Sequence, residues 1–190
     1  MVPPLIADNP TLAALWTYWR ERRGGRRMPR RRDIDPVHIP KLLPYLQLVE
    51  RIEPERRFRY RLTGSAIVEA YGRELTGKFI DEVIPPERRR VAEGHYSLVF
   101  DTCRPIYVQN KYTTTKSVDI VATRIILPLS ENDAAVSMLI MAQTFDYGSV
   151  LRGSLDGDST IAPYLGQVAF LEAEELPAQR MGSNAPRSSM

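Results

Sequence analysis

A glycine-rich stretch offers the first candidate chemistry, because Gly72 to Lys78 spells G-x-x-x-x-G-K. In a nucleotide-binding loop this pattern follows a buried strand, and the next residue is a Ser or Thr that holds magnesium. Here that next position is Phe79, and Ile67 to Tyr71 has helical rather than strand spacing. The sequence therefore argues against nucleotide hydrolysis and leaves the glycines as points of tight chain reversal.

Acidic side chains near this stretch form no pair that is suited to acid–base catalysis. They lack the spacing that would make one an acid and another a base, and they are Glu74, Asp81, Glu82 and Asp101. The sequence also lacks a nucleophile elbow, a catalytic triad order and a cluster of metal ligands. We therefore predict a protein that is not an enzyme, with no catalytic residues and no metal site.

A run of arginines from residue 20 to residue 32 is the main charge feature of the chain. It contains eight Arg and one Glu, whereas the whole chain has a net charge of only +3, so the remainder is acidic. Such a run can bind RNA, DNA, an acidic lipid surface or an acidic protein. Our candidates for anion contact are Arg26, Arg27, Arg30 and Arg31.

The alternative for this run is a solvated loop whose arginines pair with Asp and Glu on the folded body. Trp16 and Trp19 lie on an apolar helical stripe and do not alternate with the arginines as base-stacking platforms would. This pattern favours the loop over a nucleic-acid-binding segment.

Composition limits the class of protein that must position these residues. A length of 190 residues with 43% hydrophobic residues predicts one domain with a single core and terminal extensions. The single cysteine excludes an internal disulfide. The chain has neither a secretory signal nor an apolar run long enough to span a membrane, so we expect a cytoplasmic protein.

Apolar spacing predicts a mixture of helices and strands. An amphipathic helix at residues 11–23 is followed by strands at 47–52 and 58–63, short helical turns between 64 and 86, and a longer helix at 87–101. Strands at 106–112, 118–129 and 134–145 come next, and then a candidate helix at 163–176. This order is typical of an α+β fold in which helices cover one face of an antiparallel sheet.

The other face of this sheet needs a cover, because both faces of the long strand at 118–129 are partly apolar. The N-terminal helix is available for that role, either from the same chain or from a second copy. Its apolar stripe gives our candidates for a dimer or partner interface, which are Leu12, Leu15, Trp16 and Trp19.

The glycine-rich stretch resembles part of a known family. Residues 71–78, Tyr-Gly-Arg-Glu-Leu-Thr-Gly-Lys, followed by Ile80-Asp81 and Pro85-Pro86-Glu87-Arg88, are similar to the segment between the second strand and the long helix of PAS domains. The lead-in resembles that of short stand-alone bacterial PAS proteins, and it comprises Trp16, Trp19, Asp33-Ile34-Asp35-Pro36 and Leu42-Leu43-Pro44.

The resemblance implies a five-stranded antiparallel sheet in the spatial order 2-1-5-4-3, with Leu75 anchoring the loop in the core. It divides the chain into a lead-in over residues 1–46, a PAS-like domain over 47–146 and a C-terminal extension over 147–190. We expect the last part of this extension, residues 177–190, to be disordered because it is rich in Pro, Ser, Ala and Gly.

The resemblance further implies a ligand pocket between the sheet and the central helices. Our candidates for its lining, with Arg124 as the one that would pair with an anionic ligand, are Tyr71, Tyr96, Phe100, Tyr107, Arg124 and Ile125. The resemblance does not assign a cofactor. His95 lies on the long helix, where haem-binding members place their ligand, but its register matches poorly. Cys103 lacks the Asn-Cys-Arg-Phe-Leu-Gln motif of flavin-binding members.

Together these patterns predict a non-catalytic sensory or protein-interaction module of bacterial signal transduction. We expect it to bind a small molecule, to form a homodimer, or to contact a signalling partner such as a kinase or a regulator. Too few residues follow the last strand for an output domain, so we expect the output to pass through another protein. The alternatives are a basic nucleic-acid-binding protein that uses the arginine run, and a haem-binding sensor.

Overall fold

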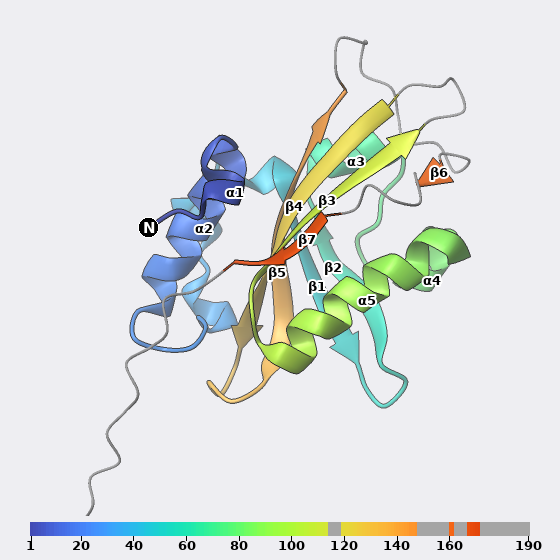
Figure 1. The fold of residues 1–190 in the computed structure, drawn as a ribbon. Coiled ribbons are helices and arrows are strands. Elements are labelled where there is room, and N and C mark those ends of the chain that lie inside the picture. The colour runs from blue at the N-terminus through green and yellow to red at the C-terminus, as the bar shows by residue number, and fades with distance from the viewer. Residues whose placement is uncertain (114–118, 148–159, 162–166, 172–190) are drawn as a thin grey trace, which may run out of the picture.

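The computed structural model describes residues 1–113, 119–147, 160–161 and 167–171. The α-helices are α1 (Pro4–Ala7), α2 (Pro10–Arg23), α3 (Ser65–Tyr71), α4 (Ile80–Val83) and α5 (Pro86–Thr102). Short 3-10 helices lie at Arg31–Asp33, Pro36–His38 and Leu43–Tyr45. The strands are β1 (Leu46–Ile52), β2 (Arg57–Thr63), β3 (Ile106–Thr113), β4 (Asp119–Ser130), β5 (Val136–Asp146), β6 (Thr160–Ile161) and β7 (Gln167–Phe170) (Figure 1).

All of these strands join one antiparallel sheet. Its main order is β2-β1-β5-β4-β3, which confirms the predicted order and the α+β class. β6 and β7 then pair with the outer edge of β3. At the opposite edge, the Gly77 N–H donates to the Tyr60 carbonyl at 2.7 Å, and the Tyr60 N–H donates to the Lys78 carbonyl at 3.0 Å. Segments of the same chain therefore cover backbone groups at both edges of the sheet.

The two longest helices begin and end at residues suited to those positions. The Asn9 side chain caps α2 by accepting from the Leu12 N–H, Pro10 takes the first helical position, and Gly24 follows the last residue with a positive φ of 56°. α5 starts at Pro86 and ends at Cys103, which has a left-handed backbone with φ 55°. No helix within the described residues is long and apolar enough to cross a membrane.

The two largest hydrophobic clusters lie on opposite sides of the sheet. On one side α4 and α5 pack on the face that carries Val49, Val108 and Ile126, and this side is called the inner face below. On the other side α1 and α2 pack on the face that carries Ile125 and Ile140, called the outer face. Figure 1 shows α2 and α5 on opposite sides of the sheet.

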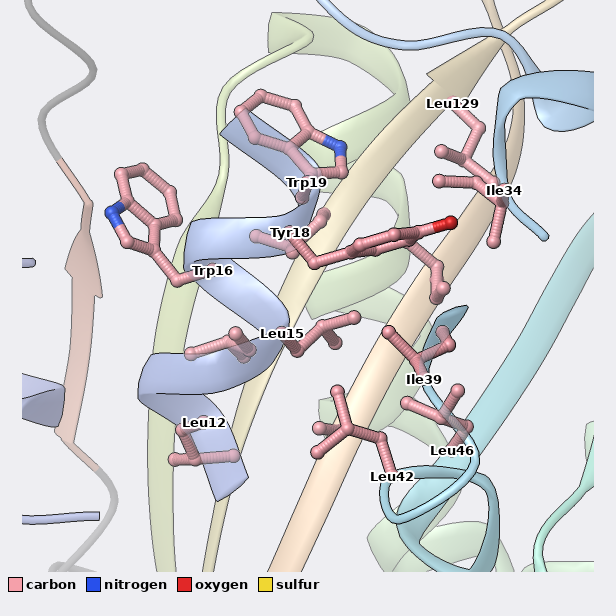
Figure 2. Packing of buried hydrophobic residues seen from close by; sticks show 14 of the residues in the cluster. Leu12, Leu15, Trp16, Tyr18, Trp19, Ile34, Ile39, Leu42, Leu46 and Leu129 are labelled. Atoms are coloured by element: carbon pink, nitrogen blue, oxygen red, sulfur yellow. The ribbon is translucent and has the colours of Figure 1, made fainter. Parts of the chain in front are cut away.

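The cover of the outer face comes from the same chain. Leu12, Leu15, Trp16 and Trp19 are at most 1% exposed. They belong to one cluster with Ile34, Ile39, Leu42 and Leu46 of the segment that follows, and Figure 2 shows the members of this cluster around α2. The Trp19 indole N–H donates to the Pro128 carbonyl of β4 at 2.9 Å. These four side chains therefore belong to the core of their own chain and present no exposed surface to a second copy.

The C-terminal part differs from the helix expected at 163–176. Residues 167–170 form β7, which pairs with Ile106 to Gln109 of β3. The physical reason is the free edge of β3, whose N–H and C=O groups gain partners when a further strand pairs with them. The expected disorder of residues 177–190 concerns a part of the chain that lies outside the described residues.

The glycine-rich stretch has the structure of a loop rather than of a phosphate cradle. Gly72 ends α3 in a left-handed conformation with φ 67°, and Gly77 turns the chain with φ 81°. Between them Leu75 is completely buried in the inner cluster, as expected. The Glu74 carboxylate accepts from the N–H groups of Leu75 and Thr76, which lowers the pKa of Glu74.

Candidate functional site

A small cavity lies between the inner face, α3 and the N-terminal half of α5. Its volume is about 20 Å³, which is enough for about one ordered water molecule. Aromatic, apolar and basic side chains share its wall, and they are Tyr60, Tyr71, Ile84, Arg88, Val91, Ala92, Asn110, Tyr112 and Arg124.

Arg124 is the central charge of this site. Its side chain extends from β4 and is 5% exposed. One guanidinium nitrogen, Nη2, lies 3.1 Å from Nδ1 of His95 on α5. Among the described residues no carboxylate forms an ion pair with Arg124, and its buried Nε has no hydrogen-bond partner. Arg124, which is always protonated, is thus buried without an opposing charge among the residues that the structure describes.

His95 is neutral in this environment. Burial lowers its pKa, and the neighbouring Arg124 guanidinium lowers it further, to about 3. A neutral imidazole has one nitrogen that accepts a hydrogen bond. Because Arg124 can only donate, Nδ1 must be that acceptor, and the imidazole proton resides on Nε2. His95 therefore orients Arg124 without balancing its charge.

Tyrosine hydroxyls supply further neutral donors around the cavity. Burial raises the pKa of Tyr60 well above its ordinary value and that of Tyr112 to about 12. Tyr96 is raised in the same direction, again mainly by burial. The Tyr60 and Tyr96 hydroxyl oxygens lie 3.5 Å apart, at the outer limit of a hydrogen bond. At neutral pH all of these hydroxyls keep their protons.

Gln143 adds an unsatisfied amide on the same face. It is 1% exposed, and both its Oε1 and its Nε2 lack a hydrogen-bond partner. In the ladder between β4 and β5, Gln143 lies directly opposite Arg124, and residues directly opposite in an antiparallel pair share a face. Two neighbouring polar groups on the inner face are thus buried with incomplete hydrogen bonding, which is uncommon in folded proteins.

The structure divides the predicted pocket residues between the two faces. Tyr71 and Arg124 line the cavity, and Tyr96 and Phe100 belong to the adjoining inner cluster. The prediction was wrong for Ile125 and Tyr107, which lie on the outer face beneath α2. Ile125 pairs with Tyr107 in the ladder, so when the pleat turns Arg124 inward, it turns both of these residues outward.

Several residues of the site were missed at the level of sequence. Tyr60, Asn110 and Gln143 lie on three different strands, far from one another along the chain. Period-2 alternation alone assigns none of them to a face. The strand register assigns Asn110 and Gln143 to a face, because Asn110 pairs with Ala122 and Gln143 pairs with Arg124. Ala122 and Arg124 are two residues apart on β4, so all four residues lie on the same face of the sheet.

The candidate anion contacts of the arginine run are engaged within the chain. Arg26 pairs with Asp33 at 2.6 Å, and Arg30 pairs with Asp133 at 2.6 Å. Arg27 donates to the Thr102 carbonyl at 2.8 Å, and Arg31 donates to the Ile34 carbonyl at 3.2 Å. These contacts tie the segment to the end of β4 and to the end of α5.

A haem does not fit the described site. The His95 ring nitrogen Nδ1 is directed at Arg124, and the cavity of about 20 Å³ beside it has no room for a porphyrin. Cys103, which ends α5, is half-buried and packs at the margin of the outer cluster, away from the cavity. Within the described residues, no group of three or more His, Cys, Asp or Glu side chains is placed to hold a metal ion.

The sequence and the structure were compared with protein families, solved structures and curated proteins. A family model described as "PAS domain" matches residues 7–142, from the end of α1 into β5. A solved structure described as "VqmA bound to DPO" is similar, with 14% identity and a TM-score of 0.44, over 58% of this chain and 56% of that chain. That similarity is too low to carry an argument about ligand or partner. No curated protein matches the sequence.

Proposed function

The chain belongs to the PAS domain family, and we propose that within it the chain acts as a sensory module without catalytic chemistry of its own. Its signal is a small molecule that binds between the inner face and α5. Its output is a changed contact with a signalling protein, such as a kinase or a regulator, or with a second copy of the chain. We place this activity in the cytoplasm.

The buried and unpaired Arg124 is the observation that carries the proposal. A charge that is removed from water costs several kcal/mol unless a partner and good hydrogen bonds offset the loss of hydration. Within the described residues, Arg124 has only the neutral His95 imidazole and nearby hydroxyls. A group that destabilises the fold and points into a cavity is best explained by a ligand that completes it.

The position of α5 provides a route from ligand to surface. His95 and Tyr96 face the site, while Asp101 near the end of the same helix pairs with Arg51 and Arg56 of the β1–β2 hairpin. A ligand larger than a water that inserts between the inner face and α5 must move side chains of this helix, because the cavity has a volume of only about 20 Å³. The helix would pass that shift to the hairpin contact.

The alternative of nucleic-acid binding has weaker support. Arg26, Arg27, Arg30 and Arg31 already have partners within the chain. Releasing them for phosphate contacts would cost the interactions that hold this segment against β4. We therefore retain the sensory module as the proposed function.

Native mass spectrometry of gently purified full-length protein tests this proposal. A retained small molecule is expected, and its identity would be established after denaturation of the same sample. Adding that molecule back should raise the thermal midpoint of stripped protein. The proposal would fail if no molecule co-purifies and no member of a metabolite collection raises the midpoint.

A further inference from the structure

The charge balance of the site identifies the class of molecule that completes it. We propose that the ligand is a compact anion that carries a carboxylate, and that Arg124 binds this group. This inference rests on the proposed function, because it assigns a chemistry to the same site.

The wall of the cavity holds the buried guanidinium of Arg124 and no carboxylate. None of its lining residues is Asp or Glu. Arg124 carries a full positive charge and contacts a histidine that is itself neutral. A cationic ligand would add like charge in a low-dielectric interior, and a neutral ligand would leave the guanidinium uncompensated. An anionic ligand avoids like-charge repulsion and also compensates the charge of the guanidinium.

The hydrogen-bonding groups of the site favour an acceptor. The Arg124 Nε–H is buried and free of partners, and a guanidinium has donors only. The hydroxyls of Tyr60 and Tyr112 keep their protons at neutral pH, and burial raises the pKa of both groups further above the ordinary value. The Asn110 amide is a further donor on the wall. Carboxylate oxygens accept several such bonds at once, and they are acceptors only.

The shape of the site favours a carboxylate over other anions. A planar guanidinium matches a planar carboxylate through two parallel hydrogen bonds. The apolar side chains of Ile84, Val91 and Ala92 on the same wall can pack against a short hydrocarbon part, which a halide or inorganic phosphate lacks. The cavity of about 20 Å³ restricts the molecule to a small one unless the wall opens.

Paired probes that differ only in charge test the inference. Sodium acetate and sodium propionate are titrated into ¹⁵N- and ¹³C-labelled protein at constant ionic strength, with acetamide and propionamide as neutral controls of the same shape. We expect saturable shifts at His95 and at Tyr112 with both carboxylates, at midpoints of about 1 mM for ligands of this size. The amides should produce shifts at least tenfold weaker.

Two variants at the site and one control variant locate the binding group. Arg124→Met should abolish saturation. Arg27→Met removes an exposed arginine that donates to the Thr102 carbonyl, and it should leave the midpoint unchanged. Tyr112→Phe keeps the ring and removes one donor, and it should weaken binding severalfold. Tyr112→Phe keeps the test decisive if Arg124→Met does not fold.

The outcomes separate this inference from the proposed function. Equal binding of amides and carboxylates, or a neutral molecule retained in native mass spectrometry, overturns the anion while leaving the sensory function intact. Chloride that competes with acetate at equal affinity overturns the carboxylate and identifies a halide site. If none of the probes shifts His95 or Tyr112 and no molecule co-purifies, both the inference and the function fail.

Discussion

Replacing Arg124 by Met should make the ligand-free protein more stable. Met has a flexible apolar side chain similar to the arginine stem, so it can fill the same volume between β4 and α5. The change removes a buried charge that has no carboxylate partner among the described residues. Replacing buried charges by well-packed apolar groups is neutral or stabilises by about 1–4 kcal/mol in other proteins.

The expected gain for Arg124→Met is smaller than the upper end of that range. His95 Nδ1 loses its donor at 3.1 Å, and an unsatisfied buried acceptor costs about 1 kcal/mol or more. We therefore expect a net gain of about 1–2 kcal/mol in the free energy of unfolding. For a chain of this size that gain corresponds to a thermal midpoint raised by roughly 3–6 °C.

Urea and thermal unfolding at pH 7, with protein stripped of bound molecules, provide the assay. Arg26→Met serves as the matched control, because it removes an arginine whose ion pair with Asp33 is formed, and it should lower stability. A loss of stability in Arg124→Met as large as that in the control would refute the reasoning. Arg124 would then be a structural residue whose interactions with His95 and the tyrosine hydroxyls outweigh the cost of burial.

Three further predictions concern the fold and its pH response. Gly64→Ala should destabilise the protein by about 3 kcal/mol or more in urea unfolding, because a Cβ would overlap the backbone carbonyl oxygens of Leu43 and Pro44; Gly25→Ala, which meets no atom within 4 Å, should be close to neutral. Trp19→Phe should cost about 1–3 kcal/mol by leaving the Pro128 carbonyl without its donor, and light scattering should show an unchanged mass because the side chain is buried within its own chain. His95 should remain neutral from pH 8 to pH 5 in carbon-detected NMR titration, since its pKa is lowered to about 3. The unfolded chain binds a proton at His95 below about pH 6.5, so this residue should make stability fall as the pH drops from 6.5 toward 3, and His95→Gln should reduce that slope.

The architecture was predictable because local signals agreed with one another. Pro10 and Gly24 mark the start and the end of α2. Gly72 and Gly77 mark the two ends of the loop that Leu75 anchors, and the strands have regular apolar runs. Since each element has its own start and stop signals, their order was enough to indicate the sheet. The prediction of a helix at 163–176 was wrong because residues 167–170 pair with β3. That pairing depends on a strand edge far away in the sequence, and local residue spacing carries no information about it.

The candidate site was predictable only in part, for a reason that lies in β4. Both faces of this strand are covered by helices, so Ile125 and Ile126 are equally buried. Alternation of apolar and polar residues then cannot indicate which of them faces α5. A shift by one residue exchanges the faces, so apolar character alone does not distinguish Ile125, which lies on the outer face, from Ile126, which lies on the inner face. Arg124 lines the cavity, and its charge distinguishes it within an apolar strand at the level of sequence.

The covered edges of the sheet have a consequence for how partners can recognise this protein. A peptide that adds itself as a strand needs free N–H and C=O groups, but β7 already occupies Ile106 to Gln109 of β3. An attached strand competes at an effective concentration on the order of millimolar. An external peptide of equal intrinsic affinity could displace β7 only near that concentration, so β7 acts as a built-in competitor against strand addition at this edge of β3.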